Sequence, residues 1–349
     1  MLVQEQVPLA SRTTLGVGGA ARWFAEVEKE DSLVEAVRFA REQHLPFFVL
    51  GGGSNLIVAD EGFPGLVVHI ALRGVEQADN RFRVAAGENW DDFVSRAVGL
   101  DFGGVECLAG IPGTVGGTPV QNVGAYGQEV SATIEQVRVL DLKSLEFLEL
   151  AASSCGFAYR RSIFNSTERG RYVVTRVDYR LVQAAGPALA YADLQRHFRG
   201  RPQPPTLAET AAAVREIRHG KGMLLVEGDP DCRSAGSFFK NPSVPQAIYD
   251  RIAAEASMPP PFYPAQPGSV KIPAAWLLEQ AGFHKGFAMG RAGISRRHTL
   301  ALVNRGGATT QEIVALRNCI VGRVEEKFGL RLEPEPVWLG PESQGQIVA

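Results

Sequence analysis

The 349-residue chain has few cysteines and no grouping of side chains that is typical of a metal site. Its four cysteines stand far apart and form no CxxC pair, so we expect reduced thiols and no disulfide framework. The six histidines form neither an HExxH motif nor a Cys/His cluster. We therefore expect no bound metal.

Basic charge and long apolar runs are also lacking. The chain has 36 Lys and Arg against 38 Asp and Glu, a net charge of −2, which does not favour nucleic-acid binding. No apolar run of about 18 residues exists to span a membrane. The first residues lack a basic start followed by an apolar stretch, so we expect no secretory signal. These absences predict a cytoplasmic protein without membrane insertion, and we expect it to act as a monomer.

Glycine is abundant, at 38 residues, and it is clustered between alternating strand and helix patterns. We expect strands at 22–28, 47–50, 66–70, 81–87, 137–142 and 171–182, with 56–58 continuing the strand at 47–50. We expect helices from a cap at Asp31 or Ser32 to Pro46, and at 90–98, 207–218, 245–256 and 273–282. A last helix follows the capping box of Thr309 and Glu312 and stops at Gly329. The pattern predicts an α+β or α/β chain.

Two common phosphate-binding motifs are excluded. Gly16, Gly18 and Ala21 satisfy GxGxxA, but no strand precedes them and a strand follows, whereas the dinucleotide fingerprint needs strand, turn and helix. No GxxxxGK[ST] loop is present either.

The sequence GGGSN at 51–55 is more informative. Three glycines after a strand expose backbone N–H groups, and Ser54 and Asn55 add polar side chains, so the turn is suited to hold a pyrophosphate without a lysine. A glycine-rich hairpin turn is the alternative.

A second glycine loop lies at 109–128, within the charge-free stretch Cys107 to Gln128. Its glycines permit close approach of backbone to a ligand, and Thr114, Gln121 and Asn122 supply polar groups. Three apolar residues are candidates to face an aromatic ring: Ile111, Val115 and Val123. Two such loops favour a large dinucleotide.

Five motifs in order give a specific resemblance: VLGGGSNLIV, GIPGTVGGTPVQNVGAYGQE, FAYRRSIF, GSFFKNP and LEPEPVWLG. Together they resemble the UDP-N-acetylenolpyruvoylglucosamine reductases, over the whole chain. The resemblance implies an α+β fold in which FAD is bound by two subdomains of the p-cresol methylhydroxylase/vanillyl-alcohol oxidase type, with a C-terminal α+β substrate-binding subdomain. The implied divisions are 1–70 with 330–349, 71–224 and 225–329.

The resemblance also implies the reaction and its cofactor residues. NADPH reduces FAD, and flavin N5 then gives a hydride to C3 of UDP-N-acetylglucosamine enolpyruvate while a proton goes to C2, a step of peptidoglycan precursor synthesis. The implied FAD-binding residues are Gly51, Gly52, Gly53, Ser54, Asn55, Leu56, Ile111, Pro112, Gly113, Thr114, Gly116, Gly117, Asn122 and Gly124.

Three catalytic residues follow from the same motifs. Arg160 matches the arginine that stabilises the enolate-like charge, with Arg161 as its neighbour. Ser237 matches the general acid that protonates C2. Glu335 matches the catalytic carboxylate. Glu333 competes with it, because both are expected on one strand, pointing to the same side.

The implied substrate-binding residues are Tyr191, Lys221, Asn241, Tyr263 and His298, with Tyr191 on a closing loop. Two rival functions remain at this point: an oxidase of the same flavin fold with another substrate, and a non-catalytic nucleotide-binding module.

Overall fold

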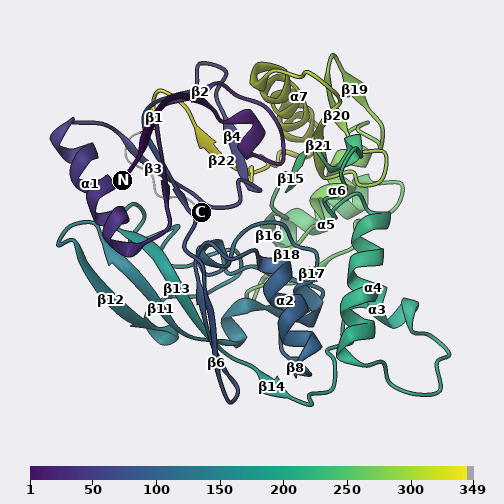
Figure 1. Cartoon of the computed structure of the whole chain (residues 1–349). Helices are drawn as coiled ribbons and strands as arrows, with labels where there is room; N and C mark the ends of the chain where they lie inside the picture. Colours follow the sequence, from purple (N-terminus) through teal and green to yellow (C-terminus); the bar gives the residue numbers. More distant parts are fainter. Residues whose placement is uncertain (344–349) are drawn as a thin grey trace.

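The computed structural model describes residues 1–343. Its first sheet has the strand order β1-β2-β5-β3 (Figure 1). Strands β2 and β3 run parallel to β5, and β1 runs antiparallel to β2. Helix α1 packs against β2 and β5. The bounds are β1 (Val3–Pro8), β2 (Ala20–Val27), α1 (Glu30–Glu42), β3 (Phe47–Leu50) and β5 (Phe63–Ile70).

The start of α1 corrects the predicted cap. The N-cap is Lys29, whose side chain makes no capping hydrogen bond, and Asp31 lies inside the helix. Glu30 and Asp31 occupy the first turn, where acidic side chains interact favourably with the positive end of the helix dipole. The helix buries Leu33, Ala36, Val37 and Ala40 on one face.

The second sheet is antiparallel, with the order β12-β11-β13-β7-β6. Helix α2 follows β7, and α3 and α4 follow the last strand of this sheet. Asn89 caps α2, and Thr206 forms a capping box with Glu209 at α4. The bounds are β6 (Val75–Ala78), β7 (Arg81–Ala85), α2 (Trp90–Gly99), β11 (Ile134–Asp141), β12 (Glu146–Ala151), β13 (Tyr172–Arg180), α3 (Ala192–His197) and α4 (Leu207–Gly220).

The third sheet has the order β15-β21-β20-β19 and packs with α6 and α7 around a separate apolar core. The predicted capping box of Thr309 and Glu312 is confirmed, and Gly329 ends α7 with φ 68°. The bounds are β15 (Ser234–Ser237), α5 (Gln246–Glu255), α6 (Ala274–Gln280), β19 (Ala288–Met289), β20 (Ala292–Ile294), β21 (Ala301–Asn304) and α7 (Thr310–Phe328).

Strand β4 (Leu56–Val58) corrects the expectation that it continues β3. It pairs parallel with β22 (Val337–Leu339), near the end of the chain, and not with the first sheet. Figure 1 shows β22 in yellow beside these N-terminal strands. The turn at 51–55 redirects the chain, and the pairing brings the LEPEP segment back to it.

Short strands and turns complete the fold. The strand pairs are β8 (Phe102–Gly103) with β14 (Val182–Gln183), β9 (Gly124–Ala125) with β10 (Gln128–Glu129), and β18 (Ser269–Lys271) with both β16 (Ser243–Pro245) and β17 (Tyr263–Pro264). Six 3-10 turns cover Ala10–Arg12, Glu106–Leu108, Val115–Gly117, Val130–Ala132, Ala152–Ser154 and Pro230–Cys232.

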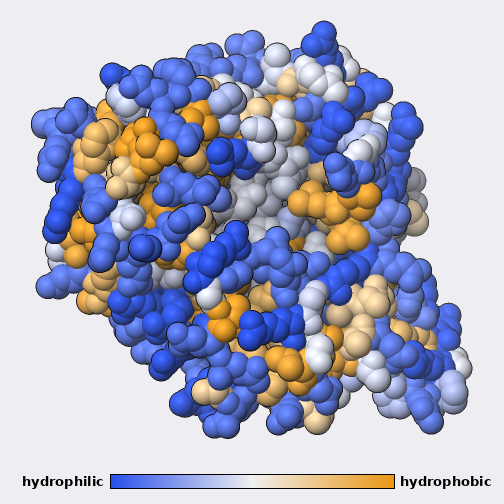
Figure 2. Space-filling model, viewed as in Figure 1, coloured by the Kyte–Doolittle hydropathy of each residue, from blue (hydrophilic) through white to orange (hydrophobic). Residues whose placement is uncertain are grey.

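The surface is mixed in character. Figure 2 shows a face that is mostly hydrophilic, with hydrophobic residues in separate patches. Within residues 1–343, no helix is both long and apolar enough to cross a membrane.

Candidate active site

The two glycine loops meet backbone to backbone. A Cβ atom at Gly52 would lie only 2.6 Å from Cα of Gly113. Ser54 Oγ donates a hydrogen bond to the carbonyl of Pro112 (3.0 Å), which ties the loops together at the same place. Side chains at these glycines would push the loops apart, so glycine is required here for packing.

The first loop keeps free backbone donors. The N–H groups of Gly52, Gly53 and Ser54 donate no hydrogen bond to any residue of the described chain, 1–343. Gly53 has φ 61°, a left-handed conformation that turns successive N–H groups towards one side. Unpaired N–H groups on a glycine turn are a binding site for an anion such as a diphosphate.

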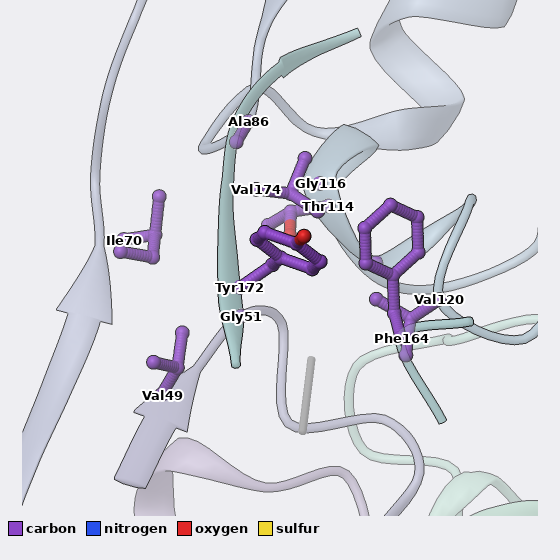
Figure 3. Close-up of a pocket in the computed structure, with 11 residues that line it drawn as sticks. Val49, Gly51, Ile70, Ala86, Thr114, Gly116, Val120, Phe164, Tyr172 and Val174 are labelled. Atoms are coloured by element: carbon purple, nitrogen blue, oxygen red, sulfur yellow. The ribbon is translucent and has the colours of Figure 1, made fainter. Parts of the chain in front are cut away.

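A narrow apolar slot lies between the first two sheets (Figure 3). Its volume is about 20 Å³, so it holds little more than one water, and an aromatic ring enters only if the slot widens. Figure 3 shows the rings of Phe164 and Tyr172 on one side of the slot and Val49 and Ile70 on the other. Both glycine loops border this slot, through Gly51, Thr114, Gly116 and Gly117.

A much larger cavity, of about 590 Å³, lies on the other side of the loops. This volume is in the range of cofactor and substrate sites. It brings together predicted residues from all five motifs and three that lie outside them: Ser54, Asn55, Ile111, Pro112, Gly124, Arg160, Tyr191, Lys221, Ser237, Asn241, His298 and Glu335. The free N–H groups, the close approach of the glycine loops, the slot and the cavity together fit a long dinucleotide such as FAD.

Ser237 reaches the cavity because the strand that carries it is irregular. The pairing of β15 with β21 shifts register between Ser234 and Ser237, and Gly236 has φ 77°. An irregularity of this kind re-aims a side chain at the end of a strand. The sequence SAGS therefore turns Ser237 into the cavity.

Arg160 is held in an unusual backbone conformation beside Glu335. Its φ is 54°, and Asn165 Nδ2 donates to its carbonyl (3.1 Å). Such strain in a non-glycine residue is typical of functional sites. Arg160 Nε lies 3.0 Å from Glu335 Oε1, yet it is buried without a hydrogen bond, because the N–H does not point at the carboxylate. This donor remains available to a ligand.

Burial dominates the electrostatics of Glu335. It raises the pKa of the carboxyl group, although Arg160 and Lys240 act in the opposite direction. A larger fraction of Glu335 is therefore protonated near neutral pH than for an exposed glutamate, and a protonated carboxyl can donate a hydrogen bond.

The structure separates the two glutamates, so the expectation of one shared strand was wrong. Residues 333–335 run antiparallel to 238–240, through backbone hydrogen bonds from Lys240 to Glu333 and from Glu335 to Phe238, and β22 begins only at Val337. The Glu333 side chain is 69% exposed and pairs with Lys240, whereas that of Glu335 is 16% exposed and pairs with Arg160. Arg161, the neighbour of Arg160, is exposed.

Tyr191 and Lys221 meet at one rim of the cavity, around Tyr126. The Tyr191 ring stands edge-on to the Tyr126 ring, with 5.3 Å between centroids, and Lys221 Nζ lies 5.7 Å from the same ring. Lys221 Nζ also lies 2.6 Å from Asp193 Oδ2, on α3. Burial raises the pKa of Tyr191, so its hydroxyl stays protonated as a donor at neutral pH.

His298 is a neutral ring in the cavity wall. Burial, with the charges of Lys221, Lys285 and Arg218, lowers the pKa of His298 to about 4. Nδ1 accepts a hydrogen bond from the backbone N–H of Leu300 (3.1 Å), so the proton of the neutral ring is on Nε2.

Asn241 and Tyr263 lie at different depths. Asn241 lines the cavity, and its Oδ1 accepts from the N–H of Ala274 (2.8 Å), which leaves its NH2 group for a ligand. Tyr263, on β17, is 51% exposed and is not among the residues that line the cavity. Its hydroxyl is close enough to Tyr191 to raise the pKa of that residue.

Three predicted residues have side chains engaged elsewhere. Leu56 belongs to the apolar core that includes β4, and Val115 is fully buried and lines neither the slot nor the large cavity. Asn122 uses its side chain within the protein, donating to Glu129 and to the Ala158 carbonyl and accepting from the Ser131 N–H. Of Asn122 only the backbone remains for a cofactor.

Arg218 was not predicted from the sequence as a site residue. This residue is buried in the cavity wall, where it donates to the carbonyls of Gly110 (3.0 Å) and Met223 (2.6 Å). Within residues 1–343 it has no carboxylate partner. Its position three residues before Lys221 on the predicted helix was the available signal. The described residues also contain no group of three or more His, Cys, Asp or Glu arranged to hold a metal ion.

Two family models match the chain. Residues 21–145 match the FAD binding domain, and residues 229–339 match the C-terminal domain of UDP-N-acetylenolpyruvoylglucosamine reductase. The first match contains both glycine loops, and the second contains Ser237, His298 and Glu335.

Relatives resemble the chain over nearly its whole length. The UDP-N-acetylenolpyruvoylglucosamine reductase of Thermobifida fusca is 47% identical, with 96% of this chain and 97% of the relative aligned. The protein of the same name from Streptomyces coelicolor is 46% identical, over 97% of this chain and 91% of the relative.

A crystal structure is also similar: UDP-N-acetylenolpyruvylglucosamine reductase from Thermus caldophilus has a TM-score of 0.68 and 28% identity, and the match covers 97% of this chain and all of that chain. These matches confirm the predicted α+β fold with an FAD-binding domain and the family's C-terminal domain.

Proposed function

The chain belongs to the UDP-N-acetylenolpyruvoylglucosamine reductase family, and from that premise we propose that it reduces UDP-N-acetylglucosamine enolpyruvate to UDP-N-acetylmuramate, with NADPH as the reductant. It is an FAD-dependent oxidoreductase, and its reaction belongs to peptidoglycan precursor synthesis. The observation that carries the proposal is the single cavity in which Arg160, Ser237 and Glu335 lie beside both glycine loops.

The two glycine loops hold FAD in this proposal. The free N–H groups of Gly52, Gly53 and Ser54 bind the diphosphate, and Ile111 and Pro112 border the large cavity beside it. Held there, FAD would supply the redox chemistry that connects NADPH to C3 of the enolpyruvyl group.

Arg160 and Glu335 stabilise the charge that hydride addition creates on the substrate. As C3 gains the hydride, negative charge spreads over C2 and the carboxylate. The unpaired Nε–H of Arg160 is a donor for that charge. Glu335, when protonated, donates a second hydrogen bond, which the raised pKa of its carboxyl group favours.

Ser237 gives the proton to C2. A serine hydroxyl is a weak acid, so it acts only on a strongly basic carbon at close range. Transfer of its proton completes the saturated lactyl group. The serine then regains a proton from solvent that enters through the open cavity.

The remaining cavity wall binds the nucleotide. Tyr191, Lys221, Asn241 and His298 present a hydroxyl, an ammonium, an amide and an Nε2–H group, all of them donors suited to phosphate and carbonyl oxygens. We place Tyr263 at the outer rim.

We propose the division into subdomains that the resemblance implies: 1–70 with 330–349, 71–224 and 225–329. Residues 344–349 lie outside the part of the chain that the structure describes. We also propose a cytoplasmic monomer.

The test is oxidation of NADPH by purified protein, followed by absorbance with and without the enolpyruvyl nucleotide. We expect a yellow protein that releases FAD on denaturation and oxidises NADPH rapidly only when the nucleotide is present. Oxidation at equal speed with oxygen alone would identify an oxidase, and no oxidation would leave only a nucleotide-binding module.

A further inference from the structure

Glu106, which takes no part in the proposed chemistry, is a buried carboxylate that joins three segments. It lies in the 3-10 turn Glu106–Leu108 and is only 1% exposed. Within residues 1–343 it has no lysine, arginine or histidine partner. Its oxygens accept three hydrogen bonds instead, from the N–H of Gly104 (2.7 Å), Nε2 of Gln128 (2.7 Å) and the N–H of Ala188 (3.0 Å).

These donors connect the second glycine loop to the segment that carries Tyr191. Gln128 ends the second glycine loop and lines the large cavity. Ala188 lies three residues before Tyr191. Cys107 strengthens both connections, because its N–H donates to Oε1 of Gln128 (2.8 Å) and its Sγ donates to the carbonyl of Ala188 (3.2 Å). The backbone of Ala188 is therefore held at both its N–H and its carbonyl group.

The two tied segments touch again at the cavity. Tyr126 stands in the turn between β9 and β10, and its ring receives the edge of the Tyr191 ring at 5.3 Å. A shift of the segment at Ala188 would therefore move Tyr191 relative to Tyr126. Burying a carboxylate without a cation is unfavourable unless several donors satisfy it, and a neutral side chain would fill the same space more easily. The carboxylate of Glu106 is therefore explained by the three hydrogen bonds that it accepts from Gly104, Gln128 and Ala188.

We propose that Glu106 is a positioning residue that fixes Tyr191 at the cavity rim through Gln128 and Ala188. The proposal rests on the proposed function, in which Tyr191 binds the nucleotide substrate. Glu106 does not touch the ligand in this proposal, so its effect on binding passes entirely through Tyr191.

The experiment is a double-mutant cycle of Glu106→Gln with Tyr191→Phe. Glutamine keeps the shape but has one acceptor oxygen in place of two, so at least one of the three N–H donors faces an NH2 group and the neutral acceptor holds the others less strongly. We expect the KM for the enolpyruvyl nucleotide to rise about 2- to 12-fold in each single variant, with flavin reduction by NADPH unchanged. Adding Tyr191→Phe to Glu106→Gln should then raise KM no further.

The matched control is Asp141→Asn, far along β11. Asp141 is also a buried carboxylate, with the Lys143 N–H and Arg171 as partners, but it does not line the cavity. Tyr191→Phe should keep its full effect in that background. Independent, multiplicative effects of Glu106→Gln and Tyr191→Phe would overturn the proposal, and so would slowing of both half-reactions.

Two further measurements cover a variant that folds poorly and a failure of the proposed function. The exchanged pair, Glu106→Gln with Gln128→Glu, returns a carboxylate to the same junction, and we expect it to recover part of the lost affinity. Hydrogen exchange needs no turnover: Glu106→Gln should speed exchange at 188–191 and leave 134–141 unchanged. Unchanged exchange at 188–191 refutes the positioning role, whereas a wild-type protein without turnover refutes only the proposed function.

Discussion

Replacing Gly52 with alanine tests whether the contact of the two glycine loops builds the FAD site. The new Cβ would lie 2.6 Å from Cα of Gly113 and 3.0 Å from its carbonyl carbon. Both atoms belong to the backbone, so no side-chain rotation relieves the contact. Ordinary contacts begin near 3.4 Å, so the loops must separate by about 0.8 Å.

That separation weakens cofactor binding more than folding. Gly52 itself is exposed and belongs to none of the three apolar cores, although the second loop contributes Val115, Val120 and Val123 to one of them. Moving the free N–H groups away from a bound diphosphate loses the equivalent of one charge-assisted hydrogen bond, about 1.5–3 kcal/mol. The affinity for FAD should therefore fall about 10- to 150-fold.

The assay is a titration of apoprotein with FAD, followed by the loss of flavin fluorescence, together with the FAD content of the purified protein. Gly99→Ala, at the end of α2, is the matched control, because its new Cβ would have nothing within 4 Å. Gly53 is unsuitable, since a Cβ there would lie 2.0 Å from the Arg12 carbonyl oxygen and φ is 61°, so folding itself would suffer. Wild-type affinity in Gly52→Ala would refute the assignment of this loop.

Three other substitutions test single groups. Ser237→Ala should leave reduction of FAD by NADPH near normal and slow reoxidation by the enolpyruvyl nucleotide about 10²- to 10⁴-fold, as measured by rapid-mixing absorbance. His298→Gln keeps a donor at the position of Nε2, whereas His298→Asn keeps only an acceptor for the Leu300 N–H. The glutamine variant should therefore have the lower KM for the nucleotide, and the reverse order of KM values would mean a structural role. Because burial raises the pKa of Glu335 in the folded state, its contribution to the free energy of unfolding falls as pH rises above the ordinary glutamate pKa, and thermal melts of Glu335→Gln should lack that pH dependence.

Local patterns predicted most elements, and the errors at β4 and at the two glutamates share one cause. The strand β3 and the capping box of α7 depend on neighbours in sequence, and both were predicted correctly. The partner of β4 and the placement of LEPEP depend on chain segments about 280 residues apart, which periodicity cannot reveal. From the sequence, Glu335 was therefore chosen over Glu333 by its position in the motif alone. In the structure, the two side chains differ because residues 333–335 pair with 238–240, which leaves Glu333 exposed and Glu335 beside Arg160.

The distribution of charge in the cavity explains why Arg218 was hard to foresee, although Arg160 and Lys221 were predicted from the resemblance. Arg218 is buried without a carboxylate partner in the described chain, and burial lowers the pKa of its guanidinium group. An unpaired buried cation costs free energy in the unliganded protein, so no stability argument would place it there. Arg160 likewise keeps an unsatisfied Nε beside a carboxylate that is itself disfavoured in its charged form. In the proposed function, a ligand with a diphosphate and a carboxylate supplies negative charge to both residues. The glycine loops, which carry no charge between Cys107 and Gln128, add backbone donors without adding cations. The proposed site thus combines neutral backbone donors for the cofactor with cationic side chains whose positive charge a bound anion neutralises.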